Sequence, residues 1–247
     1  MKQTIQIRSR IDTFVLDTFF PDTGYTNKMV LCIHGFNSSK ESSSYKYVGN
    51  KLLEKGIGYA IFSLPYHGER RIDASDFTVR NCLEDIDLVI ESLYKHFPIS
   101  KMVVEGTSFG GYLTLLKLKE NKLQKESILL KSPAIKMGEI VKSFLPTSER
   151  KLMQEKGYIV LPNSNSMRIN DSFFKELFEK KAEDVVINKE ITIMHGKDDE
   201  VVPYGISVDF ALRNPKVKII LLDGENHNYS DEGLDKVFET INSIMND

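Results

Sequence analysis

The first chemical signal lies in residues 103–117, which read VVEGTSFGGYLTLLK. Within this stretch, Ser108 stands between Gly106 and Gly110, each two residues away. A serine hydroxyl held on a sharp turn between a strand and a helix can attack an acyl carbon, and small neighbours leave the turn the room that it needs. Ordinary glycine-rich turns contain the same letters. The pattern alone therefore makes Ser108 a candidate nucleophile.

A serine nucleophile needs a general base, and the base needs a group that orients it. Among the five histidines, His227 lies in the loop LLDGENHNYSDEG, between the last apolar run and the last helical pattern. The acid is expected from the loop HGKDDEVVPYG, in which Asp198 and Asp199 are adjacent. Their side chains cannot both face His227. Spacing alone does not choose between them.

Attack on a carbonyl carbon also requires N–H groups that bind the developing oxyanion. The amide of Phe109 directly follows Ser108 at a predicted helix N-terminus, which makes it the first candidate. The second candidate is the amide of Phe36, which follows His34 and Gly35 at the end of an apolar run. Gly35 allows the tight turn that would direct this amide toward Ser108. His34 itself is expected to be a hydrogen-bonded structural residue.

Other polar residues receive less specific interpretations. His195 ends an apolar run and is expected to be structural, as is His67, which lies in the wrong loop for a base. Tyr66 and His67 are candidates for the wall of a pocket. Arg70 and Arg71 could meet an anionic substrate, although a solvated surface is the favoured interpretation.

The elements that must position these residues follow from hydrophobic periodicity. Near-continuous apolar runs, typical of parallel strands covered on both faces, occur at residues 28–35, 58–65, 101–106, 126–133, 190–196 and 217–224. The segment up to Phe20 alternates instead, which predicts antiparallel edge strands. Apolar residues at helical spacing predict helices between the runs and at the C-terminus. In such a parallel sheet, Ser108 and His227 reach the same rim.

One connection is too long for a simple crossover. About residues 134–188 are expected to form an inserted cap of short helices, with a hairpin around residues 162–166 and a helix from about 171 to 180. Apart from this insertion, residues 1–247 are expected to form a single domain.

Composition limits the partners. The formal net charge is −2, and no block rich in Lys and Arg stands out, so a small-molecule partner is expected and nucleic acid is not. The N-terminal segment builds neither a signal sequence nor a membrane span, which predicts a cytoplasmic protein that binds no membrane. Cys32 and Cys82 lie in apolar patterns and are expected to be buried and free. No metal and no cofactor are expected.

The motifs HGF, GTSFGG, HGKDDEVVP and GENH, taken in this order, resemble the α/β-hydrolase superfamily. More narrowly, the chain is similar to small bacterial serine esterases that include the cinnamoyl and feruloyl esterases, with monoglyceride lipases and acyl-peptidase catalytic domains as relatives. The family pattern His-Gly-x-x-Asp-x-x-Val-Pro aligns on residues 195–203 and selects Asp199 over Asp198. Many relatives have a serine directly after the His-Gly pair of the third strand, where this chain has Glu69.

This resemblance implies an α/β fold with a mostly parallel eight-stranded sheet, helices on both faces and a small cap. It also implies a carboxylesterase that cleaves esters of small to medium acyl groups with the triad Ser108, Asp199 and His227. A peptidase or amidase, a thioesterase or an acyltransferase would use the same triad. A ligand-binding protein without activity is disfavoured because all three residues are present. An apolar cap surface is compatible with a homodimer, which nothing in the sequence requires.

Overall fold

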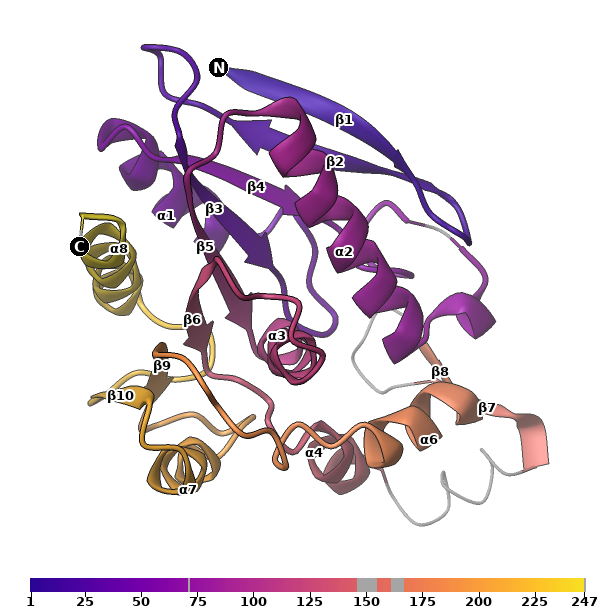
Figure 1. The fold of residues 1–247 in the computed structure, drawn as a ribbon. Helices are drawn as coiled ribbons and strands as arrows, with labels where there is room; N and C mark the ends of the chain where they lie inside the picture. The colour runs from indigo at the N-terminus through magenta and orange to yellow at the C-terminus, as the bar shows by residue number, and fades with distance from the viewer. Residues whose placement is uncertain (71, 146–154, 161–166, 247) are drawn as a thin grey trace.

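A twisted eight-stranded sheet forms the centre of the computed structural model, which describes residues 1–70, 72–145, 155–160 and 167–246 (Figure 1). Its strands are β1 (Lys2–Arg8), β2 (Thr13–Phe19), β3 (Lys28–Ile33), β4 (Gly58–Phe62), β5 (Lys101–Thr107), β6 (Ser127–Lys131), β9 (Ile191–Gly196) and β10 (Val217–Leu222). They lie in the order β1-β2-β4-β3-β5-β6-β9-β10. The pairs β1–β2 and β2–β4 are antiparallel and the others parallel, so the predicted sheet is confirmed.

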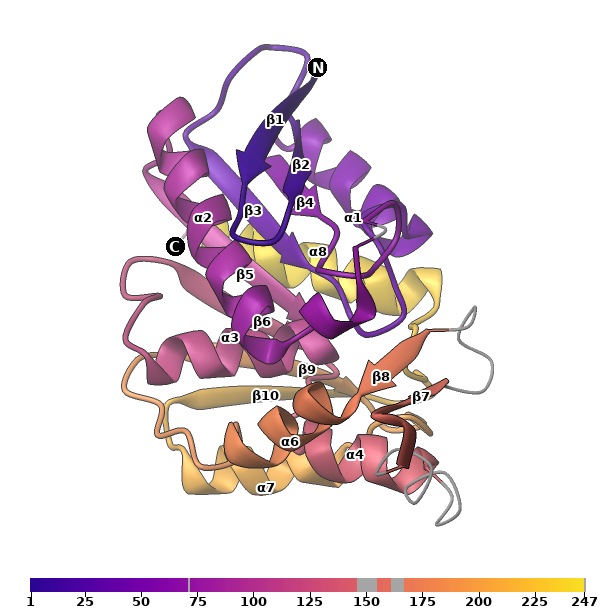
Figure 2. The same cartoon turned by 90° about the vertical axis from the view of Figure 1, so that its right-hand side faces the viewer.

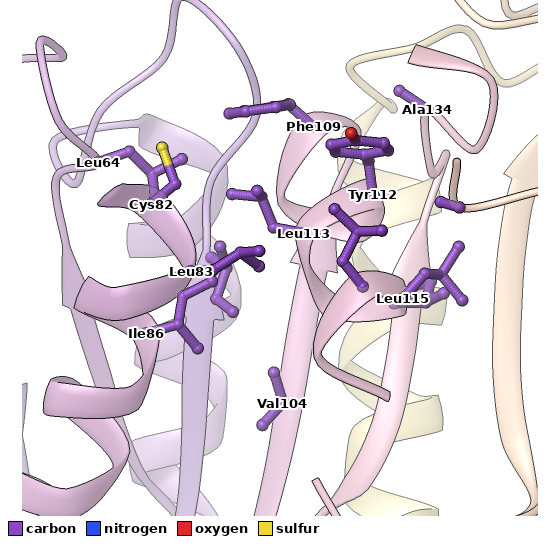
Figure 3. Packing of buried hydrophobic residues seen from close by; sticks show 14 of the residues in the cluster. Leu64, Cys82, Leu83, Ile86, Val104, Phe109, Tyr112, Leu113, Leu115 and Ala134 are labelled. Carbon is purple, nitrogen blue, oxygen red and sulfur yellow. The ribbon is translucent and has the colours of Figure 1, made fainter. Parts of the chain in front are cut away.

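Helices cover both faces of this sheet. On one face lie α1 (Ser43–Glu54) and α8 (Asp231–Asn246), side by side. On the other face lie α2 (Val79–His96), α3 (Phe109–Lys119) and α7 (Gly205–Arg213). Side chains of α2 and α3 meet over the sheet, among them Leu83 and Leu113 (Figure 3). None of the described helices combines the length and the apolarity needed to cross a membrane.

The long connection between β6 and β9 contains α4 (Met137–Phe144), a hairpin of β7 (Tyr158–Val160) and β8 (Arg168–Asn170), and α6 (Asp171–Glu179). These elements lie together beside the main sheet (Figure 2). The helix predicted from about residue 171 to 180 is confirmed. Its N-cap is Asn170, whose side chain accepts a hydrogen bond from the amide of Phe173. Antiparallel strands confirm the hairpin, while its predicted turn at 162–166 lies outside the described residues.

Arg70 shows where the sequence interpretation is wrong. Its guanidinium is not on a solvated surface but buried, with ion pairs to Asp12 and Asp85. Asp12 belongs to the turn after β1 and Asp85 to α2, so the three groups are far apart in the sequence and only the fold brings them together. Paired carboxylates make the burial of an arginine tolerable. Arg71 lies outside the described residues.

Candidate active site

Ser108 occupies the sharp turn between β5 and α3, as predicted from its position in the chain. Its φ of 53° and ψ of −113° place it in a strained backbone region that serine rarely adopts. Backbone hydrogen bonds hold it there. Its amide donates to the carbonyl of Lys131 at 2.9 Å, and its carbonyl accepts from the amides of Tyr112 and Ala134 at 3.1 and 3.0 Å.

The glycines around Ser108 provide clearance. A Cβ on Gly106 would lie 2.8 Å from the carbonyl oxygen of Gly110, and a Cβ on Gly110 would overlap the carbonyl oxygen of Ile33 in the next strand. On Gly35, a Cβ would lie 3.1 Å from the Ser108 Cβ. The turn therefore packs directly against the end of β3, and side chains at these positions would push the two segments apart.

His227 and Asp199 come together from two different loops. The His227 Nδ1 lies 2.7 Å from the Asp199 Oδ2. The Asp199 Oδ1 accepts hydrogen bonds from the amides of Val201 and Val202 at 2.9 and 2.8 Å. The ring of His195 adds a fourth contact, with its Nε2 3.2 Å from the Oδ2. Four polar neighbours thus hold one buried carboxylate in a single orientation.

These contacts fix the charge of Asp199. Burial raises its pKa, but hydrogen bonds from His195, His227 and the Val202 amide outweigh burial and lower the pKa well below the ordinary value. Because the carboxylate can only accept, the His227 Nδ1 carries the proton and its Nε2 is left as a base. Asp198 is exposed and does not contact His227 among the described hydrogen bonds.

The neighbours of His195 also determine which of its ring nitrogens carries the proton. Its Nε2 faces two acceptors, the Asp199 carboxylate and the carbonyl of Val202 at 2.9 Å, so this nitrogen carries the proton. Its Nδ1 then accepts from the hydroxyl of Ser207 at 2.8 Å. His195 is buried, as expected for a structural residue, but its contact with Asp199 was not foreseen. A histidine four residues before the acid is the signal that could have indicated it.

Ser108 and His227 line one pocket of about 110 Å³, together with Gly35 and Phe36. Among the described hydrogen bonds, none joins the Ser108 hydroxyl to His227. Such bonds are often long in unliganded sites and tighten when a substrate binds. The amide N–H groups of Phe36 and Phe109 also have no acceptor among the described residues, which leaves both able to bind an oxyanion.

The two residues of the loop after β4 that were predicted to form a pocket wall lie outside this pocket. Neither Tyr66 nor His67 is among the described residues that line this pocket. His67 is buried and its Nδ1 donates to the carbonyl of Pro65 at 2.8 Å, while burial lowers its pKa to about 3. His34 is also buried and structural: its Nε2 accepts from the amide of Leu64 at 2.9 Å, and its Nδ1 donates to the carbonyl of Gly35.

Two charged residues of the pocket were missed. Glu105 and Lys131 lie at the ends of β5 and β6 and line the pocket, although only 3% and 6% of their surfaces are exposed. A charged side chain in an otherwise apolar strand covered on both faces is the sequence signal that could have identified them. No three described His, Cys, Asp or Glu side chains lie close enough to hold a metal ion together, and Cys32 and Cys82 are buried and free.

Comparisons with known proteins agree with this fold. Residues 24–181 match a family model described as Serine aminopeptidase, S33, a match that ends before Asp199 and His227. No curated protein sequence matches.

Among solved structures, ferulic acid-bound Est1E from Butyrivibrio proteoclasticus is 23% identical, with 98% of this chain and 97% of that chain covered and a TM-score of 0.80. Alpha/beta hydrolase domain-containing protein 10 from mouse is 20% identical, with coverages of 99% and 98% and a TM-score of 0.78. An esterase, EaEST, from Exiguobacterium antarcticum is 17% identical, with coverages of 99% and 100% and a TM-score of 0.70.

Proposed function

Because the chain belongs to the Serine aminopeptidase, S33 family and is a hydrolase with the α/β-hydrolase fold, we propose that it cleaves carboxylic esters of small to medium acyl groups. The observation that carries this proposal is the pocket into which Ser108 and His227 both open, with Asp199 hydrogen-bonded behind His227. The names of two structural relatives, an esterase and a protein with bound ferulic acid, support ester chemistry.

In the proposed reaction, the Ser108 Oγ attacks the acyl carbon while the His227 Nε2 takes the hydroxyl proton. Asp199 keeps the ring in the required orientation and stabilises the imidazolium. The amides of Phe36 and Phe109 bind the oxyanion of the tetrahedral intermediate. His227 then gives the proton to the leaving alcohol. In the second half of the reaction, His227 takes a proton from water, the water attacks the acyl-enzyme, and His227 returns the proton to the Ser108 Oγ as the acid leaves.

The test is covalent labelling together with kinetics. A fluorophosphonate should label the protein at Ser108, and Ser108→Ala should lower kcat on p-nitrophenyl butyrate by about 10³-fold or more. Ser92→Ala, on α2 and remote from the pocket, serves as the control that keeps wild-type turnover. Labelling at another residue, or full activity of Ser108→Ala, would refute the proposal.

The family description favours a second candidate, release of an N-terminal amino acid from a peptide. The same triad would attack an amide carbonyl. Aminoacyl p-nitroanilides compared with p-nitrophenyl esters of matched acyl groups separate the two candidates. A higher kcat/KM on the anilides, lost in Ser108→Ala, would favour the peptidase.

A further inference from the structure

The pocket beside Ser108 extends between the sheet and helices α1 and α8. Most of its wall is apolar and comes from strand residues and from these two helices: Val30, Val48, Leu52, Leu234, Val237 and Ile241. Glu105 and Lys131 lie in this apolar surrounding. Charged groups removed from water are unfavourable unless other groups pair with them, so the partners of these two side chains matter.

Glu105 has an oxygen without a partner. Its Oε1 accepts from the Thr107 hydroxyl at 2.6 Å, whereas its Oε2 is buried and has no hydrogen-bond partner among the described residues. Glu105 and Thr107 are alternate residues of β5 and therefore face the same side of the sheet. The Cα of Glu105 is three residues, or about 10 Å, from that of Ser108. The residue that donates this bond, Thr107, directly precedes Ser108, and all three residues line the pocket.

Lys131 has spare donors. In the sheet register it lies opposite Thr107. Its ammonium lies 4.4 Å from the centre of the Tyr229 ring and donates to the carbonyl of His227 at the long distance of 3.4 Å. An ammonium has three N–H donors. In the described residues, Lys131 and Glu105 do not form an ion pair with each other.

A hydroxyl group satisfies both side chains at once. It donates one hydrogen bond, which the Glu105 Oε2 lacks, and accepts another, which the Lys131 ammonium can supply. Above about pH 7, where Glu105 is ionised, the carboxylate and the ammonium together carry no net charge, so a neutral group leaves the buried pair balanced. A ligand ammonium or carboxylate would leave an excess charge in an apolar pocket.

The acyl part of an ester fits this position better than the alcohol part. On the opposite face, under α6, the space is filled by the rings of Phe77, Phe109 and Phe173, none of which is exposed. The alcohol must also leave before water attacks the acyl-enzyme, so it cannot lie behind the acyl group. A pocket of about 110 Å³ favours a short acyl group over a long one.

We propose that the substrate is an ester of a short hydroxy acid, whose hydroxyl donates to the Glu105 Oε2 and accepts from the Lys131 Nζ. This specificity rests on the proposed esterase function of Ser108. In this proposal, Glu105 and Lys131 determine specificity. They favour hydroxyacyl groups over plain acyl groups of the same length.

The test compares the ethyl esters of butyric, 2-hydroxybutyric, 3-hydroxybutyric and 3-aminobutyric acids, with acid release followed at about pH 8, where Glu105 is ionised. The better of the two hydroxy esters should exceed ethyl butyrate in kcat/KM by about 10- to 100-fold, as expected for hydrogen bonds to charged groups. The ratio of kcat/KM for the hydroxy ester to kcat/KM for ethyl butyrate should fall toward one in each of three variants: Glu105→Leu, Glu105→Gln and Lys131→Met. Glu126→Gln changes a carboxyl that is also buried but lies before β6, outside the pocket, and should keep the wild-type ratio.

Binding gives a readout that does not depend on turnover. Ser108→Ala protein should bind the preferred hydroxy ester more tightly than ethyl butyrate in calorimetry. Equal kcat/KM for hydroxy and plain esters, preference for the amino ester, or a ratio unchanged in all three pocket variants would overturn this proposal. Those results leave the esterase proposal standing as long as Ser108 is labelled, whereas full activity of Ser108→Ala would refute the esterase proposal itself.

Discussion

Replacement of Glu105 by glutamine should change how stability depends on pH. Burial, only partly offset by the Thr107 hydroxyl and by Lys131, raises the pKa of Glu105 from 4.5 to about 7. Between these values the unfolded chain has lost the proton while the folded chain still holds it. With respect to this group, stability therefore falls as pH rises through this interval, is highest well below pH 4.5 and becomes constant above about pH 8.

The magnitude follows from the shift. Each pKa unit corresponds to about 1.4 kcal/mol, so the rise of the pKa from 4.5 to about 7 amounts to roughly 3–4 kcal/mol over the whole titration. Glutamine keeps the shape of the side chain and carries no titrating proton. Part of this loss occurs below pH 5, so Glu105→Gln should lose roughly 2–3 kcal/mol less stability than the wild type between pH 5 and pH 8.

Urea unfolding at the two pH values measures this difference, since the free energy of unfolding is linear in denaturant and the midpoint shifts with stability at a constant slope. Ser92→Ala, which removes no titrating group and lies on α2 outside the pocket, should retain the pH dependence of the wild type. If Glu105→Gln loses as much stability as the wild type between pH 5 and pH 8, burial does not raise the pKa of Glu105 and the reasoning is wrong.

Three further substitutions test other parts of the structure. Gly110→Ala should abolish most activity and lower the free energy of unfolding by about 1–3 kcal/mol, because the added Cβ overlaps a strand carbonyl. Gly205→Ala is the control: its Cβ meets open space, so its melting temperature should stay close to that of the wild type. Asp199→Asn should lower kcat by about 10⁴-fold while Asp198→Asn changes it less than about twofold, and equal effects of the two would contradict the assignment of the acid. Arg70→Met leaves two carboxylates unpaired and should lower the free energy of unfolding by about 3–5 kcal/mol, with kcat per folded molecule retained.

The sequence predicted the elements that depend on local periodicity. The six buried strands, the antiparallel start of the sheet and the helix at 171–179 follow from patterns within a few residues of each other. The strained turn at Ser108 was predictable for the same reason, because the strand, the glycines and the helix are contiguous. Neighbouring loops at one rim of a parallel sheet predicted that an acid from the loop at residues 195–205 lies beside His227, whereas the choice of Asp199 over Asp198 came from the resemblance to the family pattern.

Contacts between distant segments were not predictable. The burial of Arg70 depends on carboxylates 58 residues before and 15 residues after it. The position of the pocket depends on how α1 and α8 pack, and none of the described residues of the 134–188 insertion lines it. The charged ends of β5 and β6 therefore had no visible role in the sequence, because the cavity that they face exists only after these helices have packed.

The pairing of α1 with α8 also has a consequence for the order of folding. The hydroxyl of Tyr47 on α1 bonds to Asp235 on α8 at 2.9 Å across 188 residues, whereas the turn at Ser108 joins adjacent elements. Closing a long loop is entropically unfavourable, and α8 is synthesised after every other described element. We therefore expect the turn to form early and the α1–α8 wall late. Until that wall closes, Glu105 stays in water and ionises at its ordinary pKa, so the free-energy penalty of its burial falls on the final step of folding.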